Sequence, residues 1–247
     1  MAVQTVFARY ELKYLLTAAQ KEMLLGAMAS YMEPDQYGKT TIRNLYYDTD
    51  TYLLIRRSIE KPLYKEKLRI RSYGQATQDR PIFVELKKKY DGVVYKRRLI
   101  MPNRAAMDWL SRGTSQPEPS QIAAEITYFK ELYGTLHPAV FLSYERQAYY
   151  GKTDQSFRVT FDNNILCRQT DLSLTSEVYG TPILPAGMTL MEIKCSGGIP
   201  LWMTKILSRE KIYKTSYSKY GTAYQTLIFP EIHEIDACNT TEVNHNA

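Results

Sequence analysis

The stretch that decides the fold spans residues 84–98 and reads VELKKKYDGVVYKRR. The dipeptide Asp91-Gly92 within it is a strong signal for a two-residue turn between antiparallel strands. Such a turn places Lys87 directly opposite Lys96. Two lysines side by side in a sheet repel each other unless an anion lies between them. The hairpin therefore predicts a sheet face that is built to hold an anionic ligand.

The same alternation of charged and aliphatic residues recurs elsewhere in the chain. Side chains of a strand alternate between its two faces, so the charged residues of each segment share one face and the aliphatic residue points to the other. We expect helices to cover the aliphatic face. The four segments with this pattern are Glu11-Leu12-Lys13, Arg69-Ile70-Arg71, Glu85-Leu86-Lys87 and Glu192-Ile193-Lys194.

The charged face predicted from these strands and their neighbours is strongly basic. Its acidic members are Glu11, Glu85, Asp162 and Glu192. Its basic members are Lys13, Arg69, Arg71, Lys87, Lys96, Arg98, Arg146, Arg158, Lys194 and Lys219. The surplus of basic residues equals the net charge of the whole chain, +6. A charged face can lie inside the molecule only where the sheet closes around water and ions, which about eight strands can do.

The fold class expected from these signals is α+β, with an antiparallel eight-stranded β-barrel tunnel and flanking helices. We expect one domain over 1–230, followed by a polar, mobile tail over 231–247. The expected helices begin at a capping box at Thr17 and span 52–58, 103–112, 120–132 and two pieces of 200–227. The expected strands span 7–15, 41–47, 65–73, 81–89, 93–101, 139–149, 157–165 and 189–194.

Several function classes fit the composition poorly. The three cysteines have no paired spacing and the three histidines lie far apart, which disfavours a zinc ribbon, a disulfide framework and a histidine-ligated metal. No apolar run approaches the roughly 18 residues of a membrane span, and the N-terminus does not resemble a signal peptide. We therefore expect a cytoplasmic protein. The basic charge and 21 tyrosines would suit RNA, but no nucleic-acid-binding motif occurs, so we expect no nucleic acid partner.

A triphosphate or polyphosphate fits the charged face better. Arginine can bind phosphate oxygens with two parallel hydrogen bonds, so paired arginines suit phosphate groups. The few carboxylates are useful if they hold Mg²⁺ or Mn²⁺, which prefer oxygen ligands and bridge phosphates.

Nine segments, in order along the chain, carry a family resemblance. They are RYELKY (9–14), LYYDT (45–49), IRRSIEKPLYKEKLRIRSYG (55–74), VELK (84–87), YKRR (95–98), SYER (143–146), RVTFD (158–162), MEIK (191–194) and YSKY (217–220). With them the sequence resembles the VTC domain, the polyphosphate polymerase branch of the CYTH or triphosphate tunnel metalloenzyme superfamily, from about Phe7 to Thr226. Ser216 departs from the pattern, since relatives often have Lys there.

The resemblance implies a tunnel-shaped barrel and assigns roles to its lining. Glu192 would be the principal metal ligand, with Glu85 and Glu11 as weaker candidates. Further substrate contacts are expected from Arg98, Tyr144, Lys194, Ser218 and Lys219. The catalytic basic residues that would grip phosphate are Lys13, Arg69, Arg71, Lys87, Lys96, Arg146 and Arg158.

The expected function is a polyphosphate polymerase that uses Mn²⁺ or Mg²⁺ to transfer phosphate from ATP, or another nucleoside triphosphate, to polyphosphate. Two alternatives stay open. One is a triphosphatase in which Glu85 or Glu11 orients water, and the other is a binder of polyphosphate or nucleotide without catalysis. The resemblance also suggests a membrane protein as a partner.

Overall fold

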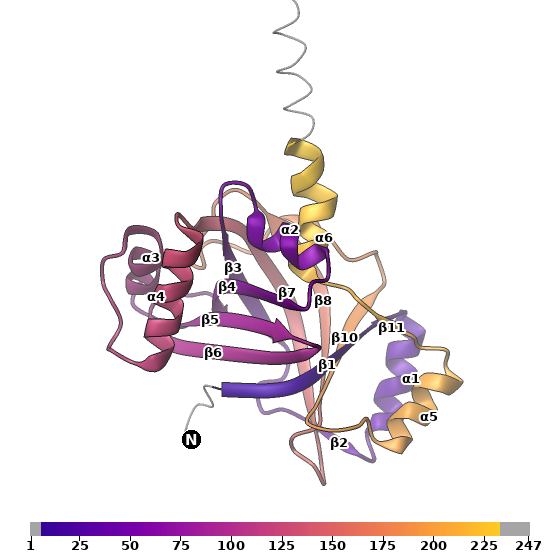
Figure 1. The fold of residues 1–247 in the computed structure, drawn as a ribbon. Helices are drawn as coiled ribbons and strands as arrows, with labels where there is room; N and C mark the ends of the chain where they lie inside the picture. The colour runs from indigo at the N-terminus through magenta and orange to yellow at the C-terminus, as the bar shows by residue number, and fades with distance from the viewer. Residues whose placement is uncertain (1–5, 233–247) are drawn as a thin grey trace, which may run out of the picture.

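An eleven-stranded antiparallel sheet carries helices on its outer side (Figure 1). The inner side of the sheet lines a cavity. The computed structural model describes residues 6–232. The strands are β1 (Val6–Leu16), β2 (Met32–Pro34), β3 (Thr40–Asp48), β4 (Tyr64–Tyr73), β5 (Pro81–Tyr90), β6 (Val93–Pro102), β7 (His137–Gly151), β8 (Arg158–Arg168), β9 (Thr181–Pro182), β10 (Thr189–Cys195) and β11 (Lys214–Thr215). The helices are α1 (Ala18–Met28), α2 (Leu53–Ile59), α3 (Asn103–Arg112), α4 (Gln121–Tyr133), α5 (Leu201–Arg209) and α6 (Lys219–Ala223), followed by a π-helical turn (Tyr224–Ile228).

The strands pair in the order β2-β7-β3-β4-β5-β6-β1-β10-β8-β9, with β11 added to β1. Strand β8 also pairs with β7. The antiparallel sheet with flanking helices is as predicted, but the simple eight-stranded barrel is wrong, because the sheet has eleven strands. The additional strands β2, β9 and β11 have only two or three residues each, so they are too short to produce an alternating pattern in the sequence.

The register of the central hairpin is confirmed. Tyr90 lies opposite Val93 across the turn, and Lys87 lies opposite Lys96. The turn needs a positive φ at both of its central residues, which Asp91 (43°) and Gly92 (82°) supply.

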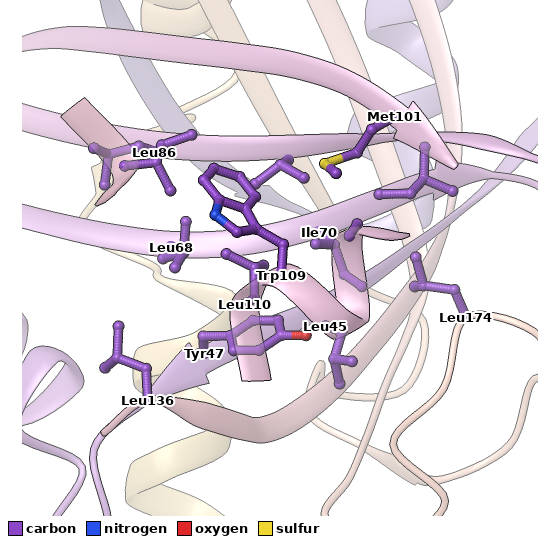
Figure 2. Packing of buried hydrophobic residues seen from close by; sticks show 14 of the residues in the cluster. Leu45, Tyr47, Leu68, Ile70, Leu86, Met101, Trp109, Leu110, Leu136 and Leu174 are labelled. Atoms are coloured by element: carbon purple, nitrogen blue, oxygen red, sulfur yellow. The ribbon is translucent and has the colours of Figure 1, made fainter. Parts of the chain in front are cut away.

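The aliphatic residues between the charged ones form the outer core, as predicted. Ile70 of β4 and Leu86 of β5 are fully buried under α3 and α4, where Trp109 is the largest buried side chain. Figure 2 shows Trp109 among these strand residues. Burial of this apolar surface is what attaches the two helices to the sheet.

Two further helix pairs cover the rest of the sheet. Helices α1 and α5 pack on β1, β8 and β10, and their core includes Ile193. Helices α2 and α6 pack together near β3 and β7 (Figure 1). The predicted capping box at the start of α1 is confirmed, because Thr17 Oγ1 accepts a hydrogen bond from the backbone amide of Gln20 and Gln20 Oε1 accepts one from the backbone amide of Thr17.

The two helical pieces predicted within 200–227 are confirmed as α5 and as α6 with its π-helical turn. The short strand β11 between them was not predicted. Residues 231 and 232 are helical, and the remainder of the predicted mobile tail lies outside the described residues. Within 6–232, no helix combines the length and the apolar composition needed to cross a membrane.

Candidate functional site

The cavity enclosed by the strands has a volume of about 1830 Å³ and a basic lining. Fifteen Lys or Arg side chains and four Asp or Glu side chains line it. Most of them come from alternate positions of β1, β4, β5, β6, β7, β8 and β10, as the strand pattern predicted.

One group of cations is organised by Glu85 of β5, which is completely buried behind the lining. Its Oε2 accepts hydrogen bonds from Arg69 Nε (2.9 Å) and Nη2 (2.7 Å), and its Oε1 accepts hydrogen bonds from Arg98 Nε (2.9 Å) and Nη2 (2.5 Å). Lys96 and Arg71 lie within 3.5 Å and 3.8 Å of the same carboxylate. Burial would raise the pKa of Glu85, but these four cations hold it well below its ordinary value.

This arrangement changes the interpretation of Glu85. Both of its oxygens are already occupied by strong donors, and the residue does not reach the cavity surface. The geometry therefore disfavours the predicted role as a metal ligand or water-orienting base, and favours a role as a buried counter-ion that fixes Arg69 and Arg98.

A second group surrounds Glu192 of β10 and Asp162 of β8. Arg146 binds Asp162 with two hydrogen bonds of 2.6 and 2.7 Å, and its Nη2 lies 3.4 Å from Glu192 Oε2. Lys219 Nζ bridges the two carboxylates, at 2.6 Å from Asp162 and 3.2 Å from Glu192. Lys194 Nζ lies 3.0 Å from Glu192. Burial would raise the pKa of Glu192, but Lys219, Lys194 and Arg146 hold it well below the ordinary value, so the carboxylate is ionised.

The first strand adds a third acidic position. Glu11 Oε2 accepts a hydrogen bond of 2.6 Å from Lys87. Burial would raise the pKa of Glu11, but Lys87 lowers it to about 2. The anion that the sequence predicted beside Lys87 is thus supplied by the protein itself, from a strand distant in sequence.

Seven of the lining cations have no carboxylate within ion-pair distance among residues 6–232. Lys67 is the best defined of them, because its Nζ donates a hydrogen bond of 3.2 Å to Ser218 Oγ. Burial, together with the nearby charges of Lys13, Lys65, Lys87 and Arg69, lowers the pKa of Lys67 well below its ordinary value. The seven are Lys13, Lys61, Lys65, Lys67, Lys89, Arg158 and Lys214.

The segment that carries Ser218 and Lys219 is fixed on both sides. Before it, the Tyr217 carbonyl accepts a hydrogen bond of 2.8 Å from Lys13 Nζ, and the Tyr217 hydroxyl donates one of 2.7 Å to the Ile183 carbonyl. After it, the Tyr220 hydroxyl donates a hydrogen bond of 2.9 Å to Asp48, which is fully buried. Ser218 and Lys219 are therefore held over the cavity.

Tyrosine hydroxyls complete the positioning of the two arginines of β4. Arg69 Nη1 donates to the Tyr46 hydroxyl at 2.8 Å, and Arg71 Nη2 donates to the Tyr144 hydroxyl at 3.0 Å. Arg71 also donates to Asn44 Oδ1 at 2.8 Å. Both guanidinium groups are thus fixed before any ligand arrives.

Fourteen of the fifteen side chains predicted for the site line this one cavity, and Glu85 lies behind it. The prediction did not assign site roles to Lys61, Lys65, Lys67, Lys89 or Lys214. Lys65 and Lys67 could have been found, because they precede Arg69 and Arg71 on the same face of one strand. Lys61 and Lys214 lie outside the alternating strands that gave the signal.

The carboxylates of the cavity could hold a metal ion only together with a substrate. Within the part of the chain that the structure describes, no cluster of three or more His, Cys, Asp or Glu side chains could hold an ion on protein ligands alone. Glu192 and Glu11 both reach the cavity, and both are ionised. One or two carboxylates completed by substrate phosphates is the donor set that Mg²⁺ accepts, so these residues fit such an ion.

The sequence model of the VTC domain matches residues 8–228. This chain belongs to the VTC domain family. A search of curated proteins finds no match to this VTC domain.

Two solved structures share the fold of this VTC domain. A candidate adenylate cyclase from Bacillus halodurans superposes with a TM-score of 0.53 at 15% identity, covering 87% of this chain and 96% of that chain. A candidate adenylyl cyclase from Hippeastrum, described as having a dominant triphosphatase activity, superposes with a TM-score of 0.54 at 16% identity, covering 89% and 95%. At these identities the likeness concerns the fold alone.

Proposed function

We propose that this VTC domain is a metal-dependent polyphosphate polymerase, which transfers the γ-phosphoryl group of ATP to the end of a growing polyphosphate chain. Membership of the family supports chemistry on phosphate chains. The observation that carries the proposal is the surplus of unpaired cations in the cavity.

Among residues 6–232, eight of the fifteen lining cations lie within ion-pair distance of Glu11, Glu85, Asp162 or Glu192, and seven have no such partner. Four carboxylates balance only part of the charge of those eight. A nucleoside triphosphate carries only about four negative charges. The cavity therefore offers more positive charge than one triphosphate can neutralise, and an extended polyanion is the ligand that matches it.

The transferring group would lie against the fixed arginines. Phosphoryl transfer needs little covalent help from the protein, and is accelerated mainly by in-line positioning and by neutralisation of the phosphate oxygens. Arg69, Arg71 and Arg146 are held in place by carboxylate or hydroxyl partners, so they can bind phosphate without reorganising. Lys87 and Lys219 add positive charge to the same cavity.

A divalent cation would be held by Glu192, with help from Glu11, and by phosphate oxygens. When bound, Mg²⁺ or Mn²⁺ would neutralise charge on the phosphates. The acceptor, a terminal phosphate, is already an anion, so growth of an existing chain needs no general base.

Triphosphate hydrolysis is the second candidate. It is favoured by the position of Glu11, whose ionised carboxylate reaches the cavity and could orient a water molecule. The two reactions share donor, metal and cavity and differ in whether phosphate or water attacks.

One incubation separates the candidates. The purified protein is incubated with ATP and Mn²⁺ or Mg²⁺, with and without a short polyphosphate primer, and the products are resolved on a gel. A ladder stimulated by primer, with release of ADP, is expected. Orthophosphate without a ladder would indicate the triphosphatase, and ATP or polyphosphate binding without turnover would indicate a binding module. The polyphosphate made by this domain would be passed to a membrane protein partner.

A further inference from the structure

Lys67 and Ser218 form a hydrogen-bonded pair in the cavity. The transfer of phosphate to an existing polyphosphate chain does not require such a pair. Lys67 Nζ lies 3.2 Å from Ser218 Oγ, and both residues line the cavity. Ser218 Oγ also accepts a hydrogen bond of 3.2 Å from the Gly221 backbone amide. In this arrangement Lys67 Nζ and the Gly221 amide both donate to Ser218 Oγ. Once Lys67 has lost a proton, its Nζ can accept the hydroxyl proton of Ser218 across the same distance.

The surroundings of Lys67 favour a neutral amine. Positive side chains face it from three strands, with Lys13 on β1, Lys65 and Arg69 on β4, and Lys87 on β5. The Tyr220 ring of α6 lies beside it, with the ring centre 5.8 Å from Nζ. In residues 6–232 no carboxylate forms an ion pair with Lys67. A lysine that is desolvated beside other cations loses its proton readily, and can then accept one from a neighbouring hydroxyl.

The hydroxyl is also held in one place. Tyr217 and Tyr220 are anchored on either side of Ser218, by the Ile183 carbonyl and by Asp48. The backbone of Gly221 can approach Ser218 this closely because glycine has no Cβ, which would lie only 3.1 Å from Ser218 Cβ. A nucleophile paired with a base within hydrogen-bonding distance, on a fixed segment beside phosphate-binding cations, is the arrangement that covalent catalysis uses.

We propose that Ser218 accepts a phosphoryl group from ATP, with Lys67 as its general base. The Lys67 amine takes the hydroxyl proton, and Ser218 Oγ forms a bond to the γ-phosphorus. The bond from that phosphorus to the β–γ bridging oxygen breaks, and ADP leaves with the electron pair. The product is a phosphoserine inside the cavity.

This activity would solve the problem of starting a chain. A polymerase that extends terminal phosphates needs a first acceptor, and phosphorylated Ser218 presents one beside the cations that hold the donor. The inference rests on the proposed function, in that both take ATP as the phosphoryl donor.

The test uses the full chain with γ-labelled ATP and Mg²⁺, without primer, quenched early and analysed by protein-bound label and peptide mapping. We expect one acid-stable, alkali-labile phosphate on Ser218. Ser218→Ala should remove it. Ser216→Ala is the matched control, because that hydroxyl also lines the cavity without a hydrogen-bonded lysine in the described structure, and label should remain.

Lys67→Arg separates a base from a mere charge, because arginine keeps the positive charge but cannot be deprotonated. Loss of a general base should slow labelling about a hundredfold or more. Labelling at the unsubstituted rate in this variant would overturn the role of Lys67, and circular dichroism would establish that each variant is folded.

The outcomes also distinguish this inference from the proposed function. ATP turnover to polyphosphate or orthophosphate with no protein-bound label, or with label on another residue, would overturn the inference and leave the phosphate chemistry intact. Label on Ser218 without polymer would support the inference and contradict the polymerase. Neither label nor ATP turnover would overturn both.

Discussion

At the scale of single residues, Glu192 is the side chain on which metal-dependent turnover should depend most. Glu192→Gln keeps the shape and removes the charge that would bind Mg²⁺ or Mn²⁺. We expect turnover of ATP to fall about a hundredfold or more, since metal stabilisation of phosphate charge is worth several kcal/mol. The matched control is Asp91→Asn, a carboxylate at the cavity rim in a turn with positive φ that Asn tolerates. Equal activity in both variants would contradict the assignment.

Glu85 should behave differently from Glu192. Glu85→Gln leaves Arg69, Arg98 and Lys96 around an uncharged group in a fully buried position. Breaking a buried ion pair in this way costs about 3–5 kcal/mol, so we expect a lower urea midpoint at pH 7. Affinity for Mn²⁺, measured by calorimetry, should stay close to that of the unsubstituted protein. A large loss of Mn²⁺ affinity without loss of stability would restore Glu85 as a metal ligand.

The carboxylates also predict how stability depends on pH. The folded-state pKa values of Glu85 and Glu192 lie well below 4.5, and that of Glu11 is about 2, so the folded protein binds fewer protons than the unfolded chain in acid. Their contribution is complete above about pH 4.5 and is lost as the pH falls towards 2. Asp48 has a raised pKa and opposes this trend. Urea unfolding at pH 7, 4.5 and 3 should show the loss, and Glu11→Gln should reduce it.

Individual site residues could be predicted because strand alternation is a local signal. It placed Arg69 and Arg71 on one face of β4. The same alternation, followed over the two preceding alternate positions of the strand, would have added Lys67 and Lys65. What the sequence could not show is which charge meets which across the cavity. The approach of Glu11 to Lys87 joins positions 76 residues apart, and no local pattern encodes it.

At the scale of elements, Asp48 links α2 to α6. Its Oδ1 accepts from the backbone amides of Thr49 (2.9 Å) and Leu54 (2.8 Å), and its Oδ2 accepts from that of Ile55 (3.0 Å) and from the Tyr220 hydroxyl (2.9 Å). Asp48 therefore binds the first turn of one helix and holds the start of another.

Removing the link should loosen the segment that carries Ser218. Tyr220→Phe deletes one hydrogen bond to a buried carboxylate, which should cost about 1–3 kcal/mol in the free energy of unfolding. Polyphosphate affinity should fall as well, because Ser218 and Lys219 lose an anchor. Tyr213→Phe, which changes an exposed tyrosine nearby, is the control. Equal polyphosphate affinity in both variants would show that Asp48 and Tyr220 only stabilise the fold.

Elements were predictable where their signals lie within one segment. The Asp91-Gly92 turn set the register of β5 and β6, and Thr17 with Gln20 marked the start of α1. The strand β11 has only two residues and exists because β1 offers it a partner, so its own sequence contains no strand signal.

At the scale of the whole molecule, the unpaired cations should discriminate between ligands by length. Replacing Lys65 and Lys89 together by Met removes two charges that no carboxylate balances within residues 6–232. Affinity for long-chain polyphosphate should fall more than affinity for ATP, and the difference should shrink at high salt, where charge interactions are screened. Titration of both ligands at two ionic strengths measures this. Equal losses for both ligands would indicate a site that takes only a triphosphate.

The pairing of β1 with β10 has a consequence for the synthesis of the protein. Residues 10–16 find their partners in residues 189–195, near the far end of the sheet-forming sequence. A ribosome will have made most of the basic strands before their last neighbour emerges, and contacts so distant along a chain form slowly. During that interval Arg146 lacks Glu192, one of its two carboxylate partners. The emerging chain therefore presents an incomplete basic face beside ribosomal RNA until β10 pairs with β1 and β8.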